Sequence, residues 1–318
     1  MSVPLSIPSP PEAWSQYDFT LFERTFSIHT YALCILAGIV VATIMTNARL
    51  KRRGAEPWVV LDIIIWAVPL GIVGARVYHV LTHPGDYFYD GADLLRTLYI
   101  WEGGNAIFGG LIGGALGAWY ACRRRGIPLP AFADALAPGI AVGQAFGRWG
   151  NYFNQEIYGT PTDLPWGLRI DPENRPAAYP DAETFHPTFL YESLWSLTTV
   201  AVVIWADRRF RLGHGRAFAL YLAMYGTARA LLELLRTDEA NLVLGLRVNQ
   251  LVALLVVAAA VVYILVSARL RPGREAQVEP ADTDHDPPSS APGDNVDQAP
   301  APVTRGEAQA TPAPRDDP

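Results

Sequence analysis

Hydrophobic residues gather in seven blocks that are separated by shorter polar segments. The blocks cover residues 30–48, 58–82, 105–122, 131–146, 188–206, 215–235 and 249–268. Most of them approach the roughly 20 residues that cross a lipid bilayer as an α-helix, and the fourth is shorter. The pattern predicts an all-α polytopic membrane protein.

Basic residues at the ends of these blocks predict the orientation of the chain. Clusters of arginine, with one lysine, occur at 49–53, 123–125, 208–211 and 269–274. The positive-inside rule places all four clusters in the cytoplasm. The third block then ends inside and the fifth begins outside, so the short block 131–146 must also cross. We therefore predict seven transmembrane helices, with the N-terminus outside and the C-terminus cytoplasmic.

Composition divides the chain into a membrane domain, residues 1–273, and a tail, residues 274–318. The predicted domain includes two long outer loops, 83–101 and 147–187. Residues 276–318 contain nine acidic residues and two arginines, a charge of -7, so the rest of the chain carries about +1 of the total of -6. The tail is too polar to bury a core, so we expect it to be disordered. No basic surface for a nucleic acid is predicted.

The sequence offers no metal-ligand pattern. The two cysteines, Cys34 and Cys122, lie in or beside apolar blocks, and neither has a neighbour at metal-ligand spacing. We interpret both as small packing residues. The N-terminal residues lack the basic region of a signal peptide.

Polar residues within the blocks concentrate towards the predicted outer face. At about 1.5 Å per helical residue, they all fall in the outer half of the membrane. They are Tyr31, Arg76, Arg148, His186, Tyr191, Glu192, Arg229 and Glu233. Because polar groups inside a membrane are costly, they often mark function. A transporter should instead place them near the midplane, so the pattern does not favour one.

Each of these features also has a structural interpretation. Arg229 and Glu233 are four residues apart and can form a helix salt bridge. Arg76 can extend to the interface, and Tyr31 fits an interfacial aromatic belt. The glycines of GGNAIFGGLIGG, residues 103–114, allow close helix packing. The histidines His29, His79 and His186 fit interfacial or hydrogen-bonding positions.

The arginines taken together favour a site for an anion. At least three of them are predicted at one depth, where they would repel one another without an anionic partner. Arginine offers phosphate bidentate, charge-assisted hydrogen bonds. The phosphate most available at that depth belongs to a phospholipid headgroup.

Several segments resemble one family. GRWGNYFNQEIYGTPTDLPWGL, residues 147–168, resembles the signature G-R-x-G-N-[FY]-x-N-x-E-x-[WY]-G of prolipoprotein diacylglyceryl transferases. HPTFLYE, YGTARALLELLRTDE, SIHTYAL, GARVYHV and GGNAIFGGLIGG resemble further segments of that family. Together they cover most of residues 25–265, and the acidic tail lies outside the resemblance.

The resemblance implies an enzyme of the bacterial cytoplasmic membrane, with its active site towards the outer leaflet. Such enzymes transfer the sn-1,2-diacylglyceryl group of phosphatidylglycerol to the lipobox cysteine of a prolipoprotein. A thioether forms and glycerol phosphate leaves, without a metal or organic cofactor. The implied partners are therefore phosphatidylglycerol, prolipoprotein signal peptides and the lipid bilayer.

Site residues follow from the matching positions. The expected catalytic residues are Arg148, Arg229, Glu156, Tyr31 and Glu233. The expected phosphatidylglycerol-binding residues are Arg148, Asn151, Gly159, Arg229, Tyr225 and Arg236. The arginines would hold the phosphate. Asn151 and Asn154 could orient phosphate or ester oxygens, or cap a turn.

One position departs from the family pattern. Many members have a histidine, assigned as a base or essential group, where this chain has Phe108. Phenylalanine cannot accept a proton, so the base stays open among Glu156, Glu233, Tyr31 and His29. Alternatively, the arginines could lower the thiol pKa from its usual value of about 8.5 sufficiently to make a base unnecessary.

An alternative function is another outward-facing transferase that acts on a phospholipid or a polyprenyl phosphate. Metal-dependent enzymes of that kind usually carry an Asp-rich motif, and none lies beside these arginines.

Overall fold

The computed structural model describes residues 6–235, 242–243, 245–275 and 278, all of which belong to one compact unit, Met1–Pro280. Seven long helices account for the seven apolar blocks. They are α1 (Thr30–Arg52), α2 (Val59–Thr82), α3 (Ile107–Arg124), α4 (Leu129–Phe153), α5 (Thr188–Phe210), α6 (Arg216–Leu232) and α7 (Val248–Leu270). The prediction of a mostly helical protein is confirmed. Within the described ranges, six helices are long and apolar enough to cross a membrane.

The one long helix outside those six is α3, which is glycine-rich and ends in arginine. By contrast, α4 is among the six and runs from Leu129 to Phe153, beyond both ends of the short predicted block. Composition therefore understated the length of α4.

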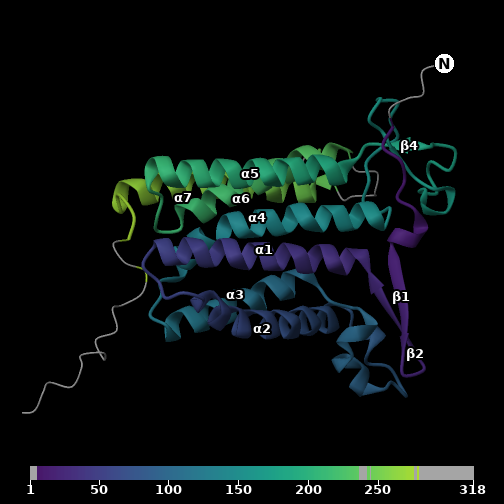
Figure 1. Ribbon diagram of the computed structural model, residues 1–318, viewed down its shortest axis with the longest axis horizontal. Helices are drawn as coiled ribbons and strands as arrows, with labels where there is room; N and C mark the ends of the chain where they lie inside the picture. The colour runs from purple at the N-terminus through teal and green to yellow at the C-terminus, as the bar shows by residue number, and fades with distance from the viewer. Residues whose placement is uncertain (1–5, 236–241, 244, 276–277, 279–318) are drawn as a thin grey trace, which may run out of the picture. The chain divides into compact units, whose positions relative to one another are not determined.

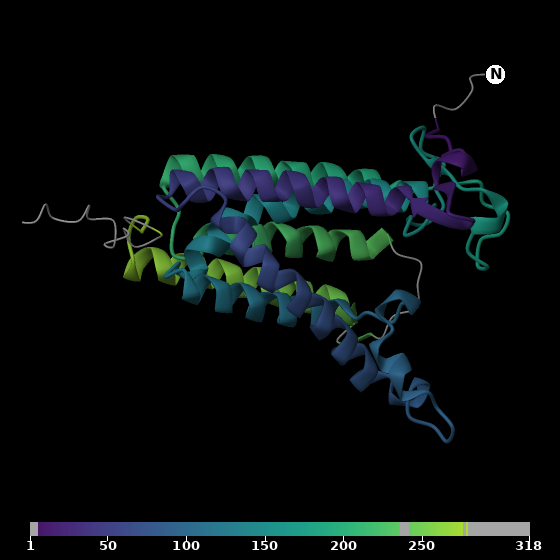
Figure 2. The same ribbon diagram turned by 60° about the horizontal axis from the view of Figure 1, so that its bottom comes forward.

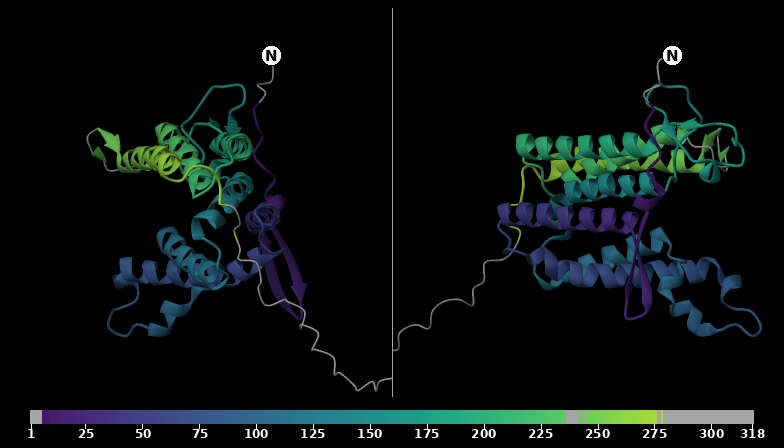
Figure 3. Two further views of the ribbon diagram at one scale, coloured as in Figure 1. Left: turned by 90° about the vertical axis from the view of Figure 1, so that its left-hand side faces the viewer. Right: turned by 45° about the vertical axis from the view of Figure 1, so that its right-hand side comes forward.

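Helix α4 is the central element. It contacts α1 on one side and α5 and α6 on the other, while α2 pairs with α3 and α6 with α7. The helices lie side by side in Figure 1, and the view along them in Figure 3 places α4 between the two groups. More than half of its apolar stretch, 56%, is buried, compared with 11% in α1 and α7. Helix α4 is therefore the most enclosed of the six helices.

Successive helices alternate in direction, so loops collect at two opposite ends. The segments 83–106 and 154–187 lie at one end with the start of α1, as Figures 1 and 2 show. Short 3-10 helices occur along the chain, namely η1 (Glu12–Trp14), η2 (Pro84–Asp86), η3 (Leu94–Leu98), η4 (Ile100–Glu102), η5 (Pro172–Asn174) and η6 (Glu233–Leu235). The basic clusters at 49–53, 123–125 and 208–211 lie at the other end.

Three short two-stranded sheets were not predicted. They pair β1 (Gln16–Leu21) with β2 (Arg24–His29), β3 (Leu168–Arg169) with β4 (Thr184–Phe185), and β5 (Leu242–Val243) with β6 (Leu246–Arg247). The first is an antiparallel hairpin that leads directly into α1. Its turn residues, Phe22 and Glu23, have φ values of 50° and 61°. Tight hairpin turns need such positive φ values, but Asn or Gly usually provides them, so the residue types did not predict this turn.

Helices α2 and α3 pack backbone to backbone through glycines spaced four residues apart. A Cβ atom added at Gly113 would lie 2.1 Å from the Leu70 carbonyl oxygen, and one added at Gly109 would lie 2.2 Å from that of Gly74. Gly117 repeats the pattern one turn further along, 2.5 Å from the Trp66 oxygen. The glycine run is therefore used for close helix packing, as its structural interpretation predicts.

Gly113→Ala should separate the two helices, because the added methyl group meets a rigid carbonyl. We expect a loss of about 1–3 kcal/mol in stability, measured by thermal unfolding in detergent. Gly114→Ala is the matched control, since its Cβ would lie 3.7 Å from the nearest atom of the facing helix, the Ala67 carbonyl oxygen. Equal unfolding temperatures for the two variants would contradict this packing.

The compact unit continues past the predicted domain boundary at residue 273. Arg274 bonds to Asp207, and Glu275 accepts a hydrogen bond from the backbone N–H of His214 at 2.6 Å. Val278 is buried in one cluster with residues from the end of α1 and the starts of α2 and α4. The predicted disorder of the tail stays a prediction, because residues 279–318 lie outside the described residues.

Candidate active site

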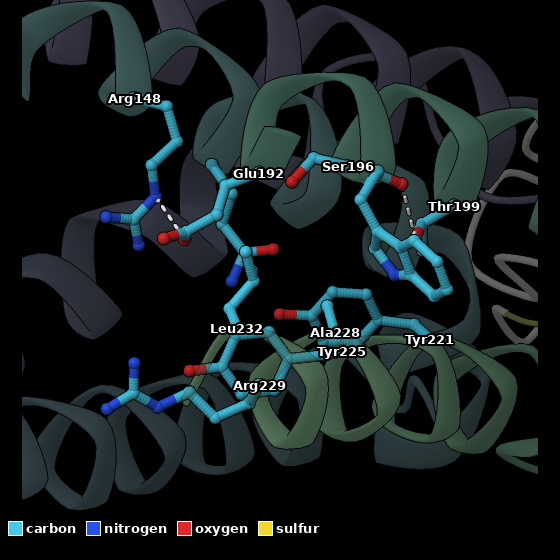
Figure 4. Close-up of a pocket in the computed structure, with 11 residues that line it drawn as sticks. Arg148, Glu192, Ser196, Thr199, Tyr221, Tyr225, Ala228, Arg229 and Leu232 are labelled. Atoms are coloured by element: carbon cyan, nitrogen blue, oxygen red, sulfur yellow. Dashed lines mark hydrogen bonds and ion pairs between the residues drawn. The ribbon is translucent and has the colours of Figure 1, made fainter. Parts of the chain in front are cut away.

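A polar pocket lies between α4, α5 and α6, towards the end that carries the long loops. It encloses about 490 Å³ of space that no atom occupies. Its lining residues are Gln144, Arg148, Glu192, Trp195, Ser196, Thr199, Tyr221, Tyr225, Ala228, Arg229 and Leu232. Figure 4 shows the guanidinium groups of Arg148 and Arg229 on the same side of this pocket, extending from different helices. Two residues predicted to share a site are thus brought to one cavity.

Arg148 is held by two polar partners near the end of α4. Its Nε lies 2.7 Å from Oε2 of Glu192 on α5, and its Nη1 donates to Oδ1 of Asn151 at 3.0 Å. The side chain stays 29% exposed, so part of the guanidinium still faces open space. Arg148 is therefore oriented without being enclosed.

Arg229 is oriented by a fully buried carboxylate. Its Nη2 lies 3.0 Å from Oε2 of Glu233, one turn further along the chain. Arg247 approaches the other oxygen of Glu233 at 3.2 Å, and Asn249 donates to that same oxygen at 3.4 Å. Glu233 thus joins the end of α6 to the start of α7. Its two cationic neighbours make Glu233 an anchor for Arg229.

The segment after α4 extends the network from Arg148. The amide nitrogen of Asn151 donates to Oε1 of Glu156 at 2.9 Å, and that of Asn154 donates to the same oxygen at 3.2 Å. Asn151 is buried and bridges Arg148 to Glu156, whereas Glu156 itself is exposed. Both asparagines therefore hold a carboxylate here. Their amide groups fix the turn that follows the helix.

Gly159 lies where that segment meets the end of α6. Its N–H donates to the carbonyl oxygen of His186 at 3.0 Å, and the N–H of Thr160 donates to that of Leu235 at 2.9 Å. A Cβ atom at Gly159 would lie 2.9 Å from the Cβ of His186. The glycine is thus required by close packing, and it ties the signature segment to the chain immediately before Arg236. Arg236 itself lies outside the described residues.

Tyr31 contacts α4 directly, although it does not line the pocket. It lies in the first turn of α1, where an added Cβ on Gly150 would meet its ring Cδ2 at 2.4 Å and its Cα at 3.2 Å. Gly150 lies between Arg148 and Asn151 in sequence. Tyr31 therefore packs against the turn of α4 that carries Arg148 and Asn151.

Tyr225 does line the pocket, and sequence analysis missed several of its neighbours. The ring of Tyr225 is stacked on that of Tyr221 at 6.2 Å between centroids. On α5, Glu192, Ser196 and Thr199 follow one another at helical spacing, so they share a face. That spacing was visible in the sequence and could have extended the candidate site along α5. Gln144, a polar residue in an apolar run, was a second unused signal.

Arg76 has a structural role in holding a loop. Its guanidinium donates to the carbonyl oxygens of Thr97 at 2.7 Å, Gly103 at 2.7 Å and Arg96 at 2.5 Å. It also lies 5.0 Å from the centre of the Tyr87 ring. Buried in this way on α2, it fixes the outer loop that follows and has no part in the pocket.

Phe108 and the histidines also lie away from the pocket lining. Phe108 is 63% exposed at the start of α3, with its ring 6.3 Å from that of Tyr78. His79 is stacked on His83 at 4.5 Å, and His29 is the exposed residue that precedes α1. His186 lies 3.3 Å from the hydroxyl of Tyr191. Neither Phe108 nor any of these histidines supplies a proton acceptor to the pocket lining.

Across the described part of the chain, no group of three or more His, Cys, Asp or Glu side chains is arranged to hold a metal ion. The expectation that no cofactor is needed stays an expectation.

The apolar helices and the pocket define a multi-pass membrane protein with two arginines in a pocket between its helices. Residues 19–266 match the family model of prolipoprotein diacylglyceryl transferase. The chain belongs to this family.

Curated relatives agree over most of the chain. A phosphatidylglycerol--prolipoprotein diacylglyceryl transferase of Streptomyces griseus is 58% identical over 251 residues, which cover 79% of this chain and 76% of the relative. One of Streptomyces coelicolor is 55% identical over 250 residues, which cover 79% and 72%. One of Mycobacteroides abscessus is 46% identical over 304 residues, which cover 91% and 85%.

Proposed function

We propose that this chain is a phosphatidylglycerol–prolipoprotein diacylglyceryl transferase, as its relatives are named. It transfers the diacylglyceryl group of phosphatidylglycerol to the thiol of a prolipoprotein, the first step of lipoprotein maturation. The observation that carries the proposal at the level of the site is the placement of Arg148 and Arg229 in one pocket between three helices. The family match and the relatives' names support the reaction itself.

The reaction forms one bond and breaks one. The cysteine sulfur attacks the glyceryl carbon that bears the phosphate ester, the carbon–oxygen bond breaks, and the thiol proton is lost. Negative charge then builds up on the leaving glycerol phosphate. Two guanidinium groups already fixed by carboxylates stabilise that charge without reorganising. Arg148 and Arg229 serve this role, with Tyr225 on the wall beside them.

The remaining predicted residues hold these two arginines in place. Asn151 and Glu156 orient Arg148 through their hydrogen-bonded chain, and Glu233 orients Arg229. Tyr31 supports the helix turn at Gly150, and Gly159 allows the close approach of its segment to His186. Among the residues that the structure describes, Glu192 is the only carboxylate in the pocket lining. It is therefore the best-placed acceptor for the thiol proton once the phosphate has replaced it as the partner of Arg148.

Glu192→Gln tests this assignment. The amide keeps a hydrogen-bond acceptor for Arg148 but cannot take a proton, so we expect kcat to fall by about 10²-fold. Glu183→Gln is the control, since Glu183 is exposed and lies outside the pocket lining, and it should keep the wild-type rate. A normal rate in Glu192→Gln would exclude Glu192 as the base.

The proposed topology has seven spans, with the N-terminus outside, the C-terminus in the cytoplasm and the pocket towards the outer leaflet. Its support is the alternation of seven helices together with basic clusters at the end opposite the long loops. A cysteine introduced at exposed Asp163 should react with a membrane-impermeant thiol reagent added to intact cells. Labelling only after cell lysis would reverse the orientation.

The function is tested by reconstitution of the full chain with phosphatidylglycerol and a lipobox peptide. The peptide should gain the mass of one diacylglyceryl group while glycerol phosphate is released in equal amount. A peptide with serine in place of the cysteine should stay unmodified. An enzyme of another phospholipid class would instead modify neither peptide, or release a different headgroup.

A further inference from the structure

A second charged pocket lies at the opposite end of the helices, between α1 and α5. It encloses about 900 Å³ of unoccupied space. Its lining residues are Met45, Ala48, Arg49, Arg52, Arg53, Ile204, Asp207, Arg208, Arg211 and Arg274. It shares no residue with the pocket around Arg148, and on α5 its lining begins at Ile204, more than one turn beyond Thr199. We call it the inner arginine pocket.

Three arginines in this pocket share a single carboxylate. Nη2 of Arg49 lies 2.9 Å from one oxygen of Asp207, Nη2 of Arg53 lies 3.3 Å from the other, and Arg274 also bonds to that second oxygen. Asp207 is buried, with 8% of its side chain exposed. One negative charge is thus surrounded by three positive charges in a poorly hydrated site.

The nearby carboxylate of Asp134 offsets one charge of this excess without satisfying Arg53. Its two oxygens already accept the backbone N–H groups of Gly215 and Phe218, each at 2.9 Å. Nη1 of Arg53 lies 3.7 Å from Asp134, too far for a hydrogen bond, and has no hydrogen-bond partner. The Arg53 side chain is only 2% exposed, so water cannot easily satisfy it. A buried guanidinium nitrogen without an acceptor is costly, and it marks a place where an acceptor is missing.

The rim of the pocket adds further positive charge. Arg52, Arg208 and Arg211 are exposed, and within the described ranges none of them pairs with a carboxylate. The lining therefore holds six arginines and one aspartate. Arginines packed this closely repel one another, and a bound phosphate would offset that repulsion through charge-assisted hydrogen bonds.

We propose that the inner arginine pocket binds the phosphate of an anionic phospholipid that acts as a structural ligand. The apolar residues Met45, Ala48 and Ile204 form one wall and continue onto the membrane-spanning parts of α1 and α5, where acyl chains would lie. A soluble phosphate or the chain's own acidic tail would use the charge but leave that wall uncovered. Basic pockets between membrane helices are suited to anionic headgroups. The bound lipid would tie α1, which carries Tyr31, to α5, which carries Glu192.

The rim arginines give a variant that leaves the buried ion pairs intact. We would compare Arg208→Gln/Arg211→Gln with Arg123→Gln/Arg209→Gln, which removes the same charge from the same end of the protein. Arg123 and Arg209 stack on Trp119 and Phe210 and lie outside the pocket. The pocket around Arg148 is unchanged in both, so it contributes equally to either measurement.

The measurement is the thermal unfolding temperature of the full chain in a non-ionic detergent, titrated with phosphatidic acid. We expect the lipid to raise this temperature in the wild type. The pocket variant should need at least about tenfold more lipid for half of the effect, since one lost charge-assisted contact alone is worth about that factor. The control variant should match the wild type within about twofold.

Several outcomes would overturn the proposal. Equal loss in both double variants would mean general charge attraction, and no lipid response in the wild type would mean that the pocket does not take an anionic lipid. Equal stabilisation by inorganic phosphate or phosphatidylcholine would reject an anionic lipid as the ligand. The readout does not depend on transfer, so the proposed function stands or falls separately.

Discussion

Arg148→Ala and Arg229→Ala should each lower kcat for diacylglyceryl transfer by about 10²–10³-fold, the usual cost of removing one pre-positioned group that stabilises developing charge. Both side chains line one pocket and each is fixed by a carboxylate, Glu192 or Glu233. Removing either leaves the leaving phosphate with half of its positive partners. The effect should appear mainly in kcat, because the charge on phosphate grows as the ester bond breaks.

The double variant shows whether the two arginines act on one phosphate. If they do, Arg148→Ala/Arg229→Ala should lose less than the product of the single losses, as coupled residues do. Arg209→Ala is the control, because Arg209 is exposed at the far end of α5 and lies outside the pocket. Initial rates with the lipobox peptide give all four values. Strictly multiplicative losses would indicate two separate tasks.

Gly150→Ala should nearly abolish transfer although it removes no polar group. The added methyl would lie 2.4 Å from the ring of Tyr31 and 3.2 Å from its Cα, so α1 must move away from α4. Gly150 lies one residue before Asn151 and two after Arg148, so the shift displaces the arginine from its partners. A misplacement of about 1 Å in a catalytic group can cost about 10²-fold.

Gly147→Ala is the matched control within the same signature. A Cβ at Gly147 would meet no atom of a neighbouring described segment within 4 Å, so this variant should keep transfer and stability close to the wild type. Comparing the two variants in rate and in unfolding temperature separates packing against Tyr31 from a general effect of alanine in this helix. Equal activity in both would show that the contact with Tyr31 does not position Arg148.

The helices were predictable because apolar blocks of this length leave the backbone few alternatives in a membrane. Blocks at 58–82 and 188–206 became α2 and α5 almost unchanged. The β1–β2 hairpin was not predictable, because its turn uses Phe22 and Glu23 where Asn and Gly are usual. Local sequence therefore describes the spanning segments better than the segments outside them.

The candidate site was predictable in its members and less so in their contacts. Arg148 and Arg229 line one pocket, as the depth of the polar residues suggested, and Tyr225, expected from the family resemblance, lines it too. Depth alone could not separate Arg76 from them, because its carbonyl partners come from a loop about 20 to 28 residues away in sequence. Depth also could not show that Glu233 pairs with Arg247, immediately before α7, as well as with Arg229. Both depend on tertiary contacts that no spacing rule records.

The most direct test is an experimental structure of the chain with phosphatidylglycerol bound. The account predicts that phosphate oxygens lie within about 2.7–2.9 Å of guanidinium nitrogens of both Arg148 and Arg229, the length of charge-assisted hydrogen bonds. The glyceryl carbon to be attacked should face Glu192. A phosphate bound elsewhere, with neither arginine in contact, would contradict the account.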